Sequence, residues 1–480
     1  MKRKWIILLM LVSLVVGASG TYVFMELTGK DEAVQEETEQ QSNSDQDLVS
    51  PHLNKVLKAY ELITSSYVDK VEGTDLVEGA IEGMLSTLDD PYSTYMDENM
   101  AKQFSDILDS TFDGIGAEVG MKDGKIVIVS PFKNSPAEKA GLRANDQILE
   151  VDGASVEGLD LYEATLKIRG KKGTMVTLKI ARQGLSEPLT VDVKRDQIPK
   201  ISVNGELKKQ NGKDIGYLQI TSFSEDTANE FAEHLKELEG KGMEGLIIDV
   251  RGNPGGLLPS VEEILKQLIS KEKPYYQIER RDGKKVRYFS SLEKEKEYPV
   301  AVLIDKDSAS ASEILAAALS EAEGYKLIGE KTFGKGTVQQ AVPMGDGTNI
   351  KLTLFKWLTP DGNWVHKKGI QPDIEVAQPE IFRTHPLQIK KALVKDMNNE
   401  QVKNAQQMLN GLGFAPGRED GYFSGGTEAA VKAFQNEKGL EATGIIDQKT
   451  ASALESAVLE ETKKEKNDLQ LQTALRYIAK

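Results

Sequence analysis

The spacing of apolar residues changes several times along this chain, and each change marks a new region. Between residues 53 and 88 they recur every three or four positions, which predicts two amphipathic helices that end before Pro91, with Thr74 and Asp75 as caps. A second region shows short alternating runs, which predict strands around a single helix. From Ile215 onward strands and helices alternate, which is typical of an α/β sheet with ligands at the carboxyl ends of its strands.

These patterns give specific elements. The strand-rich region is predicted to form strands at Lys125–Val129, Gln147–Val151, Met175–Ala181 and Leu189–Lys194, with a helix at Leu159–Ile168. The α/β region is predicted to contain Ile215–Ile220, Glu225–Leu238, Gly245–Val250, Leu258–Ile269, Val300–Ile304 and a helix at Glu313–Ala322. An amphipathic pattern at Asp468–Ile478 predicts a closing helix that packs back on the body of the protein.

The first residues carry a membrane signal. Three basic residues precede the apolar run Trp5–Phe24, which is long enough to cross a bilayer as a helix. The basic flank favours a cytoplasmic N-terminus, so the domains that follow are expected to be extracytoplasmic. Gly17–Gly20 resembles a signal-peptidase cleavage region, and a retained anchor and a cleaved signal peptide both stay open. Asp31–Asp47 is acidic and rich in Gln and Ser, which predicts a flexible linker.

Composition narrows the chemistry. A chain of 480 residues suggests about three domains. The formal charge of −15 and the absence of basic clusters argue against a nucleic-acid partner. There is no cysteine, which removes thiol nucleophiles, thiolate metal sites and disulfides. The four histidines carry neither a metal-ligand spacing nor a triad motif, so no metal and no cofactor are expected.

Candidate chemistry lies between Asp305 and Gln340. A predicted buried strand leads into Ser308, Ser310 and Ser312, and a helix follows. Ser310 to Glu313 fits a capping box, in which the two residues satisfy each other's backbone donors. The same helix N-terminus would favour a developing negative charge. A cap and a nucleophile are both open on these residues alone.

A glycine pair follows the strand Gly245–Val250. Arg251 begins the run RGNPGG, which ends in Gly255 and Gly256. Two glycines can turn their N–H groups toward a substrate with no side chain in the way, as an oxyanion hole requires. An ordinary strand-to-helix turn is the alternative.

The strand-rich region resembles a PDZ domain. The matching segments are GIGA, SPAEKAGLRANDQILEVDG and IRGKKGTMVTLKIAR. The resemblance implies that the loop made of Gly114, Ile115, Gly116 and Ala117 receives the carboxylate of a peptide C-terminus. Asn145 stands where the family usually has glycine, a mild departure.

With DVRGNPGG, SASASEI and GEKTFGKGTVQQ in this order behind a PDZ segment, the chain resembles the carboxy-terminal processing (tail-specific) proteases from Thr74 to Val376. The family implies a Ser–Lys protease whose α/β core is related to the crotonase and Clp-type peptidases, with an inserted PDZ domain. Carried over by position, the resemblance implies the following roles: nucleophile Ser310, base Lys335, third member Gln339, and oxyanion donors Gly255 or Gly256 together with Ala311.

These implied roles are chemically sensible. A lysine acts as a base only where burial lowers its pKa, and Phe333 with the flanking glycines is expected to supply an apolar site. Lys335 and Gln339 share one face if the segment is extended, whereas Gln340 lies on the other. The alternatives are a solvated lysine and a sheet-surface glutamine, with Ser308 and Ser312 as rival nucleophiles.

Two features point to regulation and targeting. Arg169 ends the PDZ helix and is expected to change contacts when a substrate tail occupies the PDZ groove; a surface arginine that caps the helix is the alternative. Residues 396–458 resemble a helical peptidoglycan-binding module. Most of the matching residues are core or turn positions, so cell-wall binding and a structural or dimer-forming role both stay open.

The sequence therefore predicts a multidomain α/β protein with helical N- and C-terminal units. Its expected function is extracytoplasmic endoproteolysis, by a homodimer, of proteins recognised through their C-terminal tails. The ectodomain of a membrane protein, as in sporulation signalling, is one expected substrate. A catalytically silent cell-wall adaptor and an acyl-CoA enzyme of crotonase type are the alternatives. The expected domains are an anchor or signal peptide (1–25), acidic linker (26–50), helical unit (51–100), PDZ domain (101–197), protease core (198–378), linker (379–395), peptidoglycan-binding-like domain (396–458) and closing helix (459–480).

Overall fold

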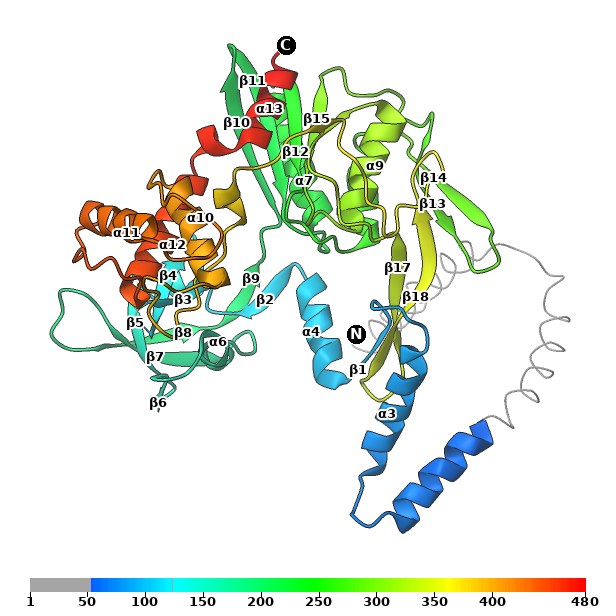
Figure 1. Cartoon of the computed structure of the whole chain (residues 1–480). Coiled ribbons are helices and arrows are strands. Elements are labelled where there is room, and N and C mark those ends of the chain that lie inside the picture. The colour runs from blue at the N-terminus through cyan, green and yellow to red at the C-terminus, as the bar shows by residue number, and fades with distance from the viewer. Residues whose placement is uncertain (1–52, 123) are drawn as a thin grey trace, which may run out of the picture. The chain divides into compact units, whose positions relative to one another are not determined.

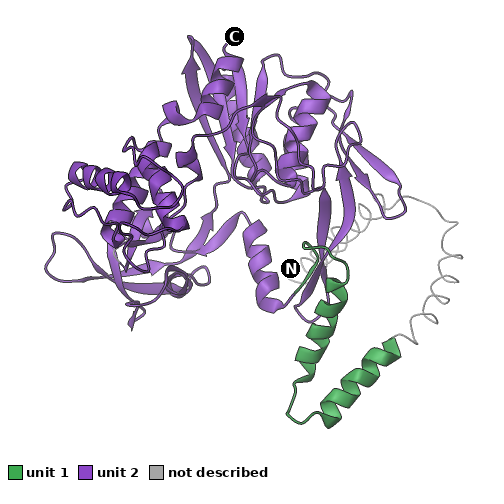
Figure 2. Cartoon of the chain, viewed as in Figure 1, with its two compact units in different colours: residues 1–95 green, residues 96–480 purple. Residues whose placement is uncertain are grey.

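A computed structural model of the chain describes residues 53–122 and 124–480 (Figure 1). The expected anchor and the acidic linker lie outside these residues. Among the helices that are described, none has the length and apolar character needed to span a bilayer. The chain divides after Tyr95 into two compact units, which are coloured separately in Figure 2 and are described here in turn.

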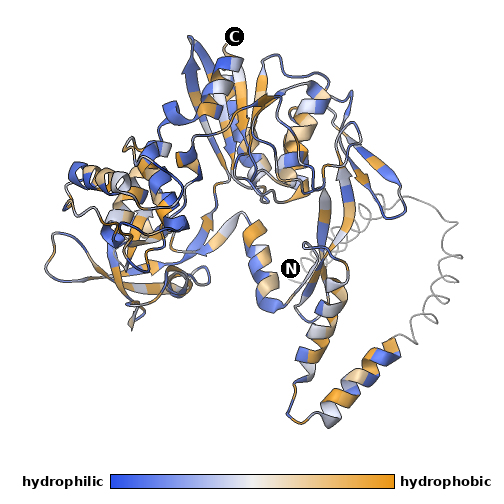
Figure 3. Cartoon of the chain, in the orientation of Figure 1, coloured by the Kyte–Doolittle hydropathy of each residue, from blue (hydrophilic) through white to orange (hydrophobic). Residues whose placement is uncertain are grey.

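The first unit contains the two predicted amphipathic helices. One covers residues 53–66 and the other is α3 (Gly73–Ser86). The residue before α3 is Glu72, so Thr74 and Asp75 lie in its first turn and the prediction that they cap it was wrong. No residue of α3 is buried, and apolar positions of the first helix, such as Leu57 and Leu62, are exposed. Hydrophobic and hydrophilic residues are mixed along both helices (Figure 3). Both helices therefore present apolar surface that this unit does not cover.

The second unit begins with α4 and the strand-rich domain. Its sheet has the order β3-β4-β5-β7-β8, with β6 beside β5, and encloses a core that includes Ile128, Leu178 and Ile180. A two-stranded ribbon, β2 with β9, flanks this sheet in sequence. The predicted domain boundary at residue 101 falls inside α4. The elements are α4 (Glu98–Leu108), β2 (Thr111–Gly114), β3 (Ala117–Lys122), β4 (Lys125–Pro131), α5 (Pro136–Lys139), β5 (Gln147–Val151), β6 (Ala154–Ser155), α6 (Leu161–Ile168), β7 (Met175–Ala181), β8 (Leu189–Lys194) and β9 (Asp196–Pro199).

A six-stranded sheet forms the centre of the α/β region. Its order is β10-β11-β12-β15-β16-β19, and all neighbouring strands except β10 and β11 run parallel. Every residue of β12 and β15 is buried, which explains why both strands read as unbroken apolar runs. The strands are β10 (Val203–Gln210), β11 (Lys213–Ile220), β12 (Gly245–Asp249), β15 (Val300–Ile304), β16 (Lys326–Gly329) and β19 (Ile374–Glu375).

Helices cover both faces of this sheet. Leu246, Ile248 and Val302 face a core shared with α7 (Thr227–Gly240), α8 (Leu258–Leu265) and α9 (Ala311–Glu323). The alternate residues, among them Ile247 and Leu303, face α13 (Leu469–Ile478). The final helix of the chain therefore supplies the third layer of the α/β core, and the prediction that it packs back on the body is confirmed.

A second antiparallel sheet lies beside this core and includes β13 (Pro274–Glu279), β14 (Lys285–Phe289), β17 (Thr337–Pro343) and β18 (Asn349–Leu358). The short strand β1 (Thr94–Met96) spans the division between the two units.

The peptidoglycan-binding-like region is a separate helical core. Leu409, Phe423, Phe434 and Leu454 are fully buried in it, as expected for core positions of such a module. Its helices lie between β19 and α13 in the sequence, so this region is inserted before the last helix of the α/β core. The predicted boundary at residue 459 falls inside α12. The elements are η1 (Glu380–Arg383), α10 (Glu400–Gly411), α11 (Gly425–Glu437), α12 (Gln448–Thr462) and η2 (Glu465–Asn467).

Packing of α13 on the sheet can be tested at one glycine. A Cβ atom at Gly245 would lie 2.2 Å from Cγ2 of Ile478, so Gly245→Ala should force α13 outward and destabilise the protein by about 1–3 kcal/mol. Gly240→Ala is the matched control, because that position has open space. Urea unfolding should show a lower midpoint for Gly245→Ala and an unchanged or slightly higher one for Gly240→Ala. Equal midpoints would contradict the packing.

Candidate active site

Ser310 occupies a strained position between β15 and α9. Its φ of 55° and ψ of −113° differ from the extended backbone that an ordinary N-cap residue adopts. A non-glycine residue with positive φ costs free energy and persists where the surroundings hold it in place, often at functional sites. A helix cap alone does not require this strained backbone conformation at Ser310.

The two neighbouring serines have structural partners. Both are fully buried: the Ser308 hydroxyl donates to the carbonyl of Val250 over 2.8 Å, and the Ser312 hydroxyl donates to the carbonyl of Asn253 over 2.9 Å. The run of residues 251–256 is called the glycine loop below. The two hydroxyls thus fasten this loop and the residue before it to the start of α9. Ser310 is only half-buried, so its side chain is the one of the three that a substrate can reach.

The glycine loop lies directly against Ser310. A Cβ atom on Gly255 would stand 2.8 Å from Cβ of Ser310 and 3.0 Å from the backbone N of Ala311, so only glycine fits there. Gly255 itself donates its N–H to Oδ1 of Asn253 over 2.8 Å. That bond occupies the N–H of Gly255. Of the two glycines, Gly256 is therefore the better candidate to act as an oxyanion donor together with Ala311.

Asn253 organises this loop and was not singled out by the sequence analysis. It is fully buried and donates its side-chain amide to the carbonyl of Ile220 over 2.8 Å. Its own carbonyl accepts from the Ala309 N–H at 3.1 Å. An asparagine inside a glycine-rich turn was the available signal, because its amide can replace missing backbone partners.

Glu313 connects the start of α9 to the segment that carries Lys335. Its carboxylate is fully buried. Oε2 accepts from the N–H of Ser310 at 2.9 Å and of Lys335 at 2.8 Å. Oε1 accepts from the Thr332 hydroxyl at 2.6 Å and from the Gly334 N–H at 2.8 Å. The predicted bond from Glu313 to the Ser310 backbone is confirmed, but three further donors share the same carboxylate.

Two tryptophans hold the Lys335 segment from the other side. Trp357 donates its indole N–H to the Lys335 carbonyl over 2.8 Å, and Trp364 donates to the Gly336 carbonyl over the same distance. Lys335 is half-buried. Phe333 is 58 % exposed, so the expectation that it shields the lysine was wrong. Hydrogen bonds to the backbone, rather than burial under apolar side chains, hold the Lys335 segment in place.

Gln339 lies on β17 with its amide group engaged. Its Nε2 donates to the hydroxyls of Thr337 at 2.9 Å and Thr353 at 3.0 Å. Thr337 and Gln339 therefore share a face of the strand, and Gln340 is exposed, as the alternation predicts. Lys335 precedes β17, so the expected alternation does not extend to it.

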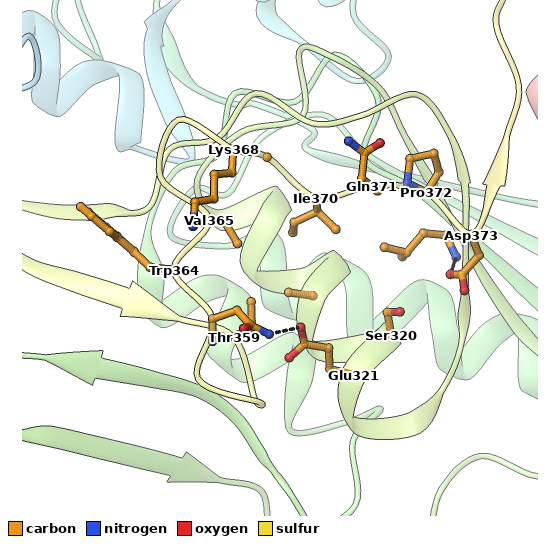
Figure 4. A pocket seen from close by; sticks show the side chains of 14 residues that line it. Ser320, Glu321, Thr359, Trp364, Val365, Lys368, Ile370, Gln371, Pro372 and Asp373 are labelled. Carbon is orange, nitrogen blue, oxygen red and sulfur yellow. Dashed lines mark hydrogen bonds between the residues drawn. The ribbon is translucent and has the colours of Figure 1, made fainter.

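A cavity of about 480 Å³ lies beside the second half of α9 (Figure 4). Its wall includes Lys368 and Gly369. The same segment packs closely on Gly334, because a Cβ atom added at Gly334 would lie 2.8 Å from the backbone N of Gly369. Neither Ser310 nor Lys335 lines it. Within residues 53–122 and 124–480, no group of three acidic or histidine side chains could hold a metal ion.

The predicted peptide-binding loop joins β2 to β3. Gly116 has φ of 72°, and a Cβ there would stand 2.5 Å from Cβ of Ser135. The Ile115 carbonyl accepts from the Ala137 N–H at 2.8 Å. Asn145 also has a positive φ, of 65°, which explains why glycine is usual at that position.

Arg169 contacts the ribbon next to this domain. Its guanidinium carbon lies 5.2 Å from the ring centroid of Phe112 in β2. Such a cation–π contact contributes about 0.5–1 kcal/mol where it is exposed. Arg169 also follows α6 directly, so the predicted position at the end of the PDZ helix is confirmed.

Profiles of four known families match parts of the chain. The profile of peptidase family S41 matches residues 214–376, and a PDZ profile matches residues 114–194. A putative peptidoglycan-binding domain matches residues 398–454, and the N-terminal domain of the activating protease CtpB matches residues 14–100. These ranges lie within the predicted domains, except that the last of them begins inside the expected anchor.

Several relatives match over almost their full length. The chain is 57 % identical to the carboxy-terminal processing protease CtpB of Bacillus subtilis, over 97 % of each chain. It is 44 % identical to CtpA of the same organism, over 89 % of this chain and 90 % of the other. Among solved structures, the photosystem II D1 C-terminal processing protease is 27 % identical, with a TM-score of 0.41, over 67 % of this chain and 92 % of that one.

The serine at a strained helix start, the glycine loop against it and the PDZ domain thus occur in a chain with this degree of identity to two processing proteases. The protein belongs to peptidase family S41 and is a carboxy-terminal processing serine protease.

Proposed function

We propose that peptide hydrolysis proceeds through a dyad in which Ser310 is the nucleophile and Lys335 the general base. The observation that carries this proposal is the shared Glu313 oxygen, which accepts from the backbone N–H of both residues. One buried carboxylate thereby fixes the two backbones relative to each other. Such positioning is what a proton transfer between neighbouring side chains needs.

The reaction has two halves. The Ser310 Oγ attacks the scissile carbonyl carbon while its proton passes to the neutral amine of Lys335, and the charged lysine then gives that proton to the leaving amine. Water attacks the resulting ester in the same way and releases the second product. The N–H groups of Gly256 and Ala311 stabilise the oxyanion of each tetrahedral intermediate.

Gln339 is assigned the role of orienting the amine of Lys335. Its Nε2 donates to two threonines, so its Oε1 is turned to accept a hydrogen bond. An acceptor beside the amine of Lys335 would direct the lone pair of the lysine toward Ser310. Gln339 is therefore assigned the orienting role rather than a role in proton transfer.

Substrate selection is assigned to the PDZ domain. The N–H groups of the loop Gly114–Ala117 would bind a terminal carboxylate, with the tail added as a strand. Arg169 contacts the ribbon that flanks the domain in sequence, which supports a regulatory role for it. We infer that tail binding changes the Arg169 contact and favours the active arrangement of the dyad.

Cellular context follows from the remaining regions. We infer that the apolar N-terminal segment places the protease outside the cytoplasm, as an anchor or a signal peptide. The exposed apolar helices of the first unit support dimerisation, and the helical module before α13 supports binding to the cell wall. A signalling role on a membrane-protein ectodomain, as in sporulation, is the biological setting that we propose.

The nucleophile can be tested among three serines. Casein cleavage should fall at least about a thousandfold in Ser310→Ala, because removal of a nucleophile leaves only residual catalysis. Ser308→Ala and Ser312→Ala should remain active and lose about 1–3 kcal/mol of stability through an unsatisfied carbonyl partner. Loss of cleavage in folded Ser308→Ala with activity retained in Ser310→Ala would reverse the assignment.

Tail sensing can be tested on the substrate. An unstructured protein should be cut more slowly once its last few residues are removed, because the PDZ loop then has no terminal carboxylate to bind. The difference should shrink in Arg169→Ala if this residue couples binding to activity. Equal cleavage of the full and the shortened substrate by the wild-type enzyme would argue against tail sensing.

A further inference from the structure

Arg251 links the glycine loop to the end of the chain. It follows β12 and immediately precedes Gly252, so it is the first residue of that loop. Its Nη2 lies 2.6 Å from Oδ2 of Asp249 and 2.8 Å from Oδ2 of Asp468, and its Nη1 donates to Oδ1 of Asp468 at 2.9 Å. The guanidinium therefore makes a bidentate bond to a residue more than two hundred positions away in sequence.

Asp468 is itself held from several directions. Its Oδ1 accepts from the Leu471 N–H at 2.9 Å, which caps α13, and from Nε2 of Gln378 at 2.6 Å. Gln470 accepts from Nη1 of Arg251 at 3.0 Å and donates to the carbonyl of Val376 over 2.8 Å. The start of α13 is thus attached to the segment after β19 and to Arg251 together.

Burial makes this contact stronger than a surface ion pair. The side chains of Arg251 and Asp468 are each 15 % exposed, so water screens them little. Bidentate arginine–carboxylate pairs also fix direction, because two parallel bonds leave little freedom of rotation. Removal of one partner from such a pair is costly.

The backbone on both sides of Arg251 is held by further hydrogen bonds. The Gly252 N–H donates to Oδ1 of Asp305 at 2.9 Å, and the Val250 carbonyl accepts from the Ser308 hydroxyl. These bonds come from the segment that leads to Ser310. The side chain of Arg251 is held by Asp468 at the start of α13. The loop is therefore fastened on one side to the Ser310 segment and on the other to α13.

We propose that Asp468 is a positioning residue for hydrolysis: it fixes Arg251 and thereby holds the loop Gly252–Gly256 where the Gly256 N–H can meet the oxyanion at Ser310. The proposal rests on the proposed function, since it assumes the oxyanion role of Gly256. It makes the last helix a part of the catalytic apparatus as well as a layer of the core.

The pair should stay charged over the working pH range. Burial favours the neutral carboxyl, but the hydrogen bonds from Arg251 outweigh it and hold the pKa of Asp468 below its usual value. A carboxylate with a lowered pKa stabilises the fold above its unfolded pKa of about 3.9 and loses that effect as pH falls through the folded pKa. The shape of the activity profile near neutral pH should therefore not depend on this group.

Asp468→Asn tests the proposal. Asparagine keeps an oxygen that caps α13, but it removes the charge that pairs with Arg251. We expect kcat on a peptide substrate to fall about 10- to 100-fold with KM within about twofold, because the loss affects the transition state. The inhibition constant of a peptide boronate, which forms a tetrahedral adduct with serine, should rise by a similar factor.

Glu465→Gln is the matched control. Glu465 pairs with Lys208 at 2.7 Å in the segment just before α13, but no contact joins it to Arg251 within the described residues. Its kcat and boronate affinity should equal those of the wild type. A merely structural role would instead lower the thermal midpoint of Asp468→Asn and leave both constants unchanged, and this result would overturn the proposal.

Two further measurements keep the test decisive. If Asp468→Asn does not fold, Arg251→Lys replaces it, because lysine keeps the charge but cannot make the two parallel bonds to Asp468; unchanged kcat and boronate affinity in that variant would also overturn the proposal. Ser310→Ala is assayed in parallel. Full activity in Ser310→Ala would refute the proposed function, whereas wild-type kcat in Asp468→Asn with an inactive Ser310→Ala would refute only the role of Asp468.

Discussion

The active-site region depends on one buried carboxylate. Glu313 receives two backbone N–H groups on one oxygen and an N–H and a hydroxyl on the other, from both the Ser310 segment and the Lys335 segment. An unpaired buried carboxylate would be costly, and four donors offset that cost. The same arrangement means that neither segment can shift without breaking bonds to the other.

Around this carboxylate the chain builds support from distant sequence. Ser308 and Ser312 fasten the glycine loop to α9, Trp357 and Trp364 hold the lysine segment, and Arg251 reaches α13. The peptidoglycan-binding-like region lies in the sequence between the α/β sheet and its last helix. An insertion of this kind adds a helical module to the chain without interrupting the sheet of the protease core.

The sequence predicted the elements of the sheet and the start of α9 well, because β12 and β15 are buried on both faces and α9 starts at a serine–glutamate pair. It did not predict which side chains and backbone groups form hydrogen bonds with each other. Nothing in the local pattern places Asp468 beside Arg251, or shows that Gly255 donates to Asn253 while Gly256 does not. Phe333 was expected to help supply an apolar site for Lys335, whereas its ring is 58 % exposed.

The most direct test of this account is Glu313→Gln, compared with Glu321→Gln near the other end of α9. Glutamine has the same size, but its NH₂ group would replace one accepting oxygen and leave at least one backbone N–H without an acceptor, at about 1–3 kcal/mol. The account predicts that kcat and the rate of Ser310 labelling by a fluorophosphonate fall about 100-fold or more in Glu313→Gln, since about 1.4 kcal/mol is tenfold, and stay unchanged in Glu321→Gln. Wild-type rates in folded Glu313→Gln would contradict it.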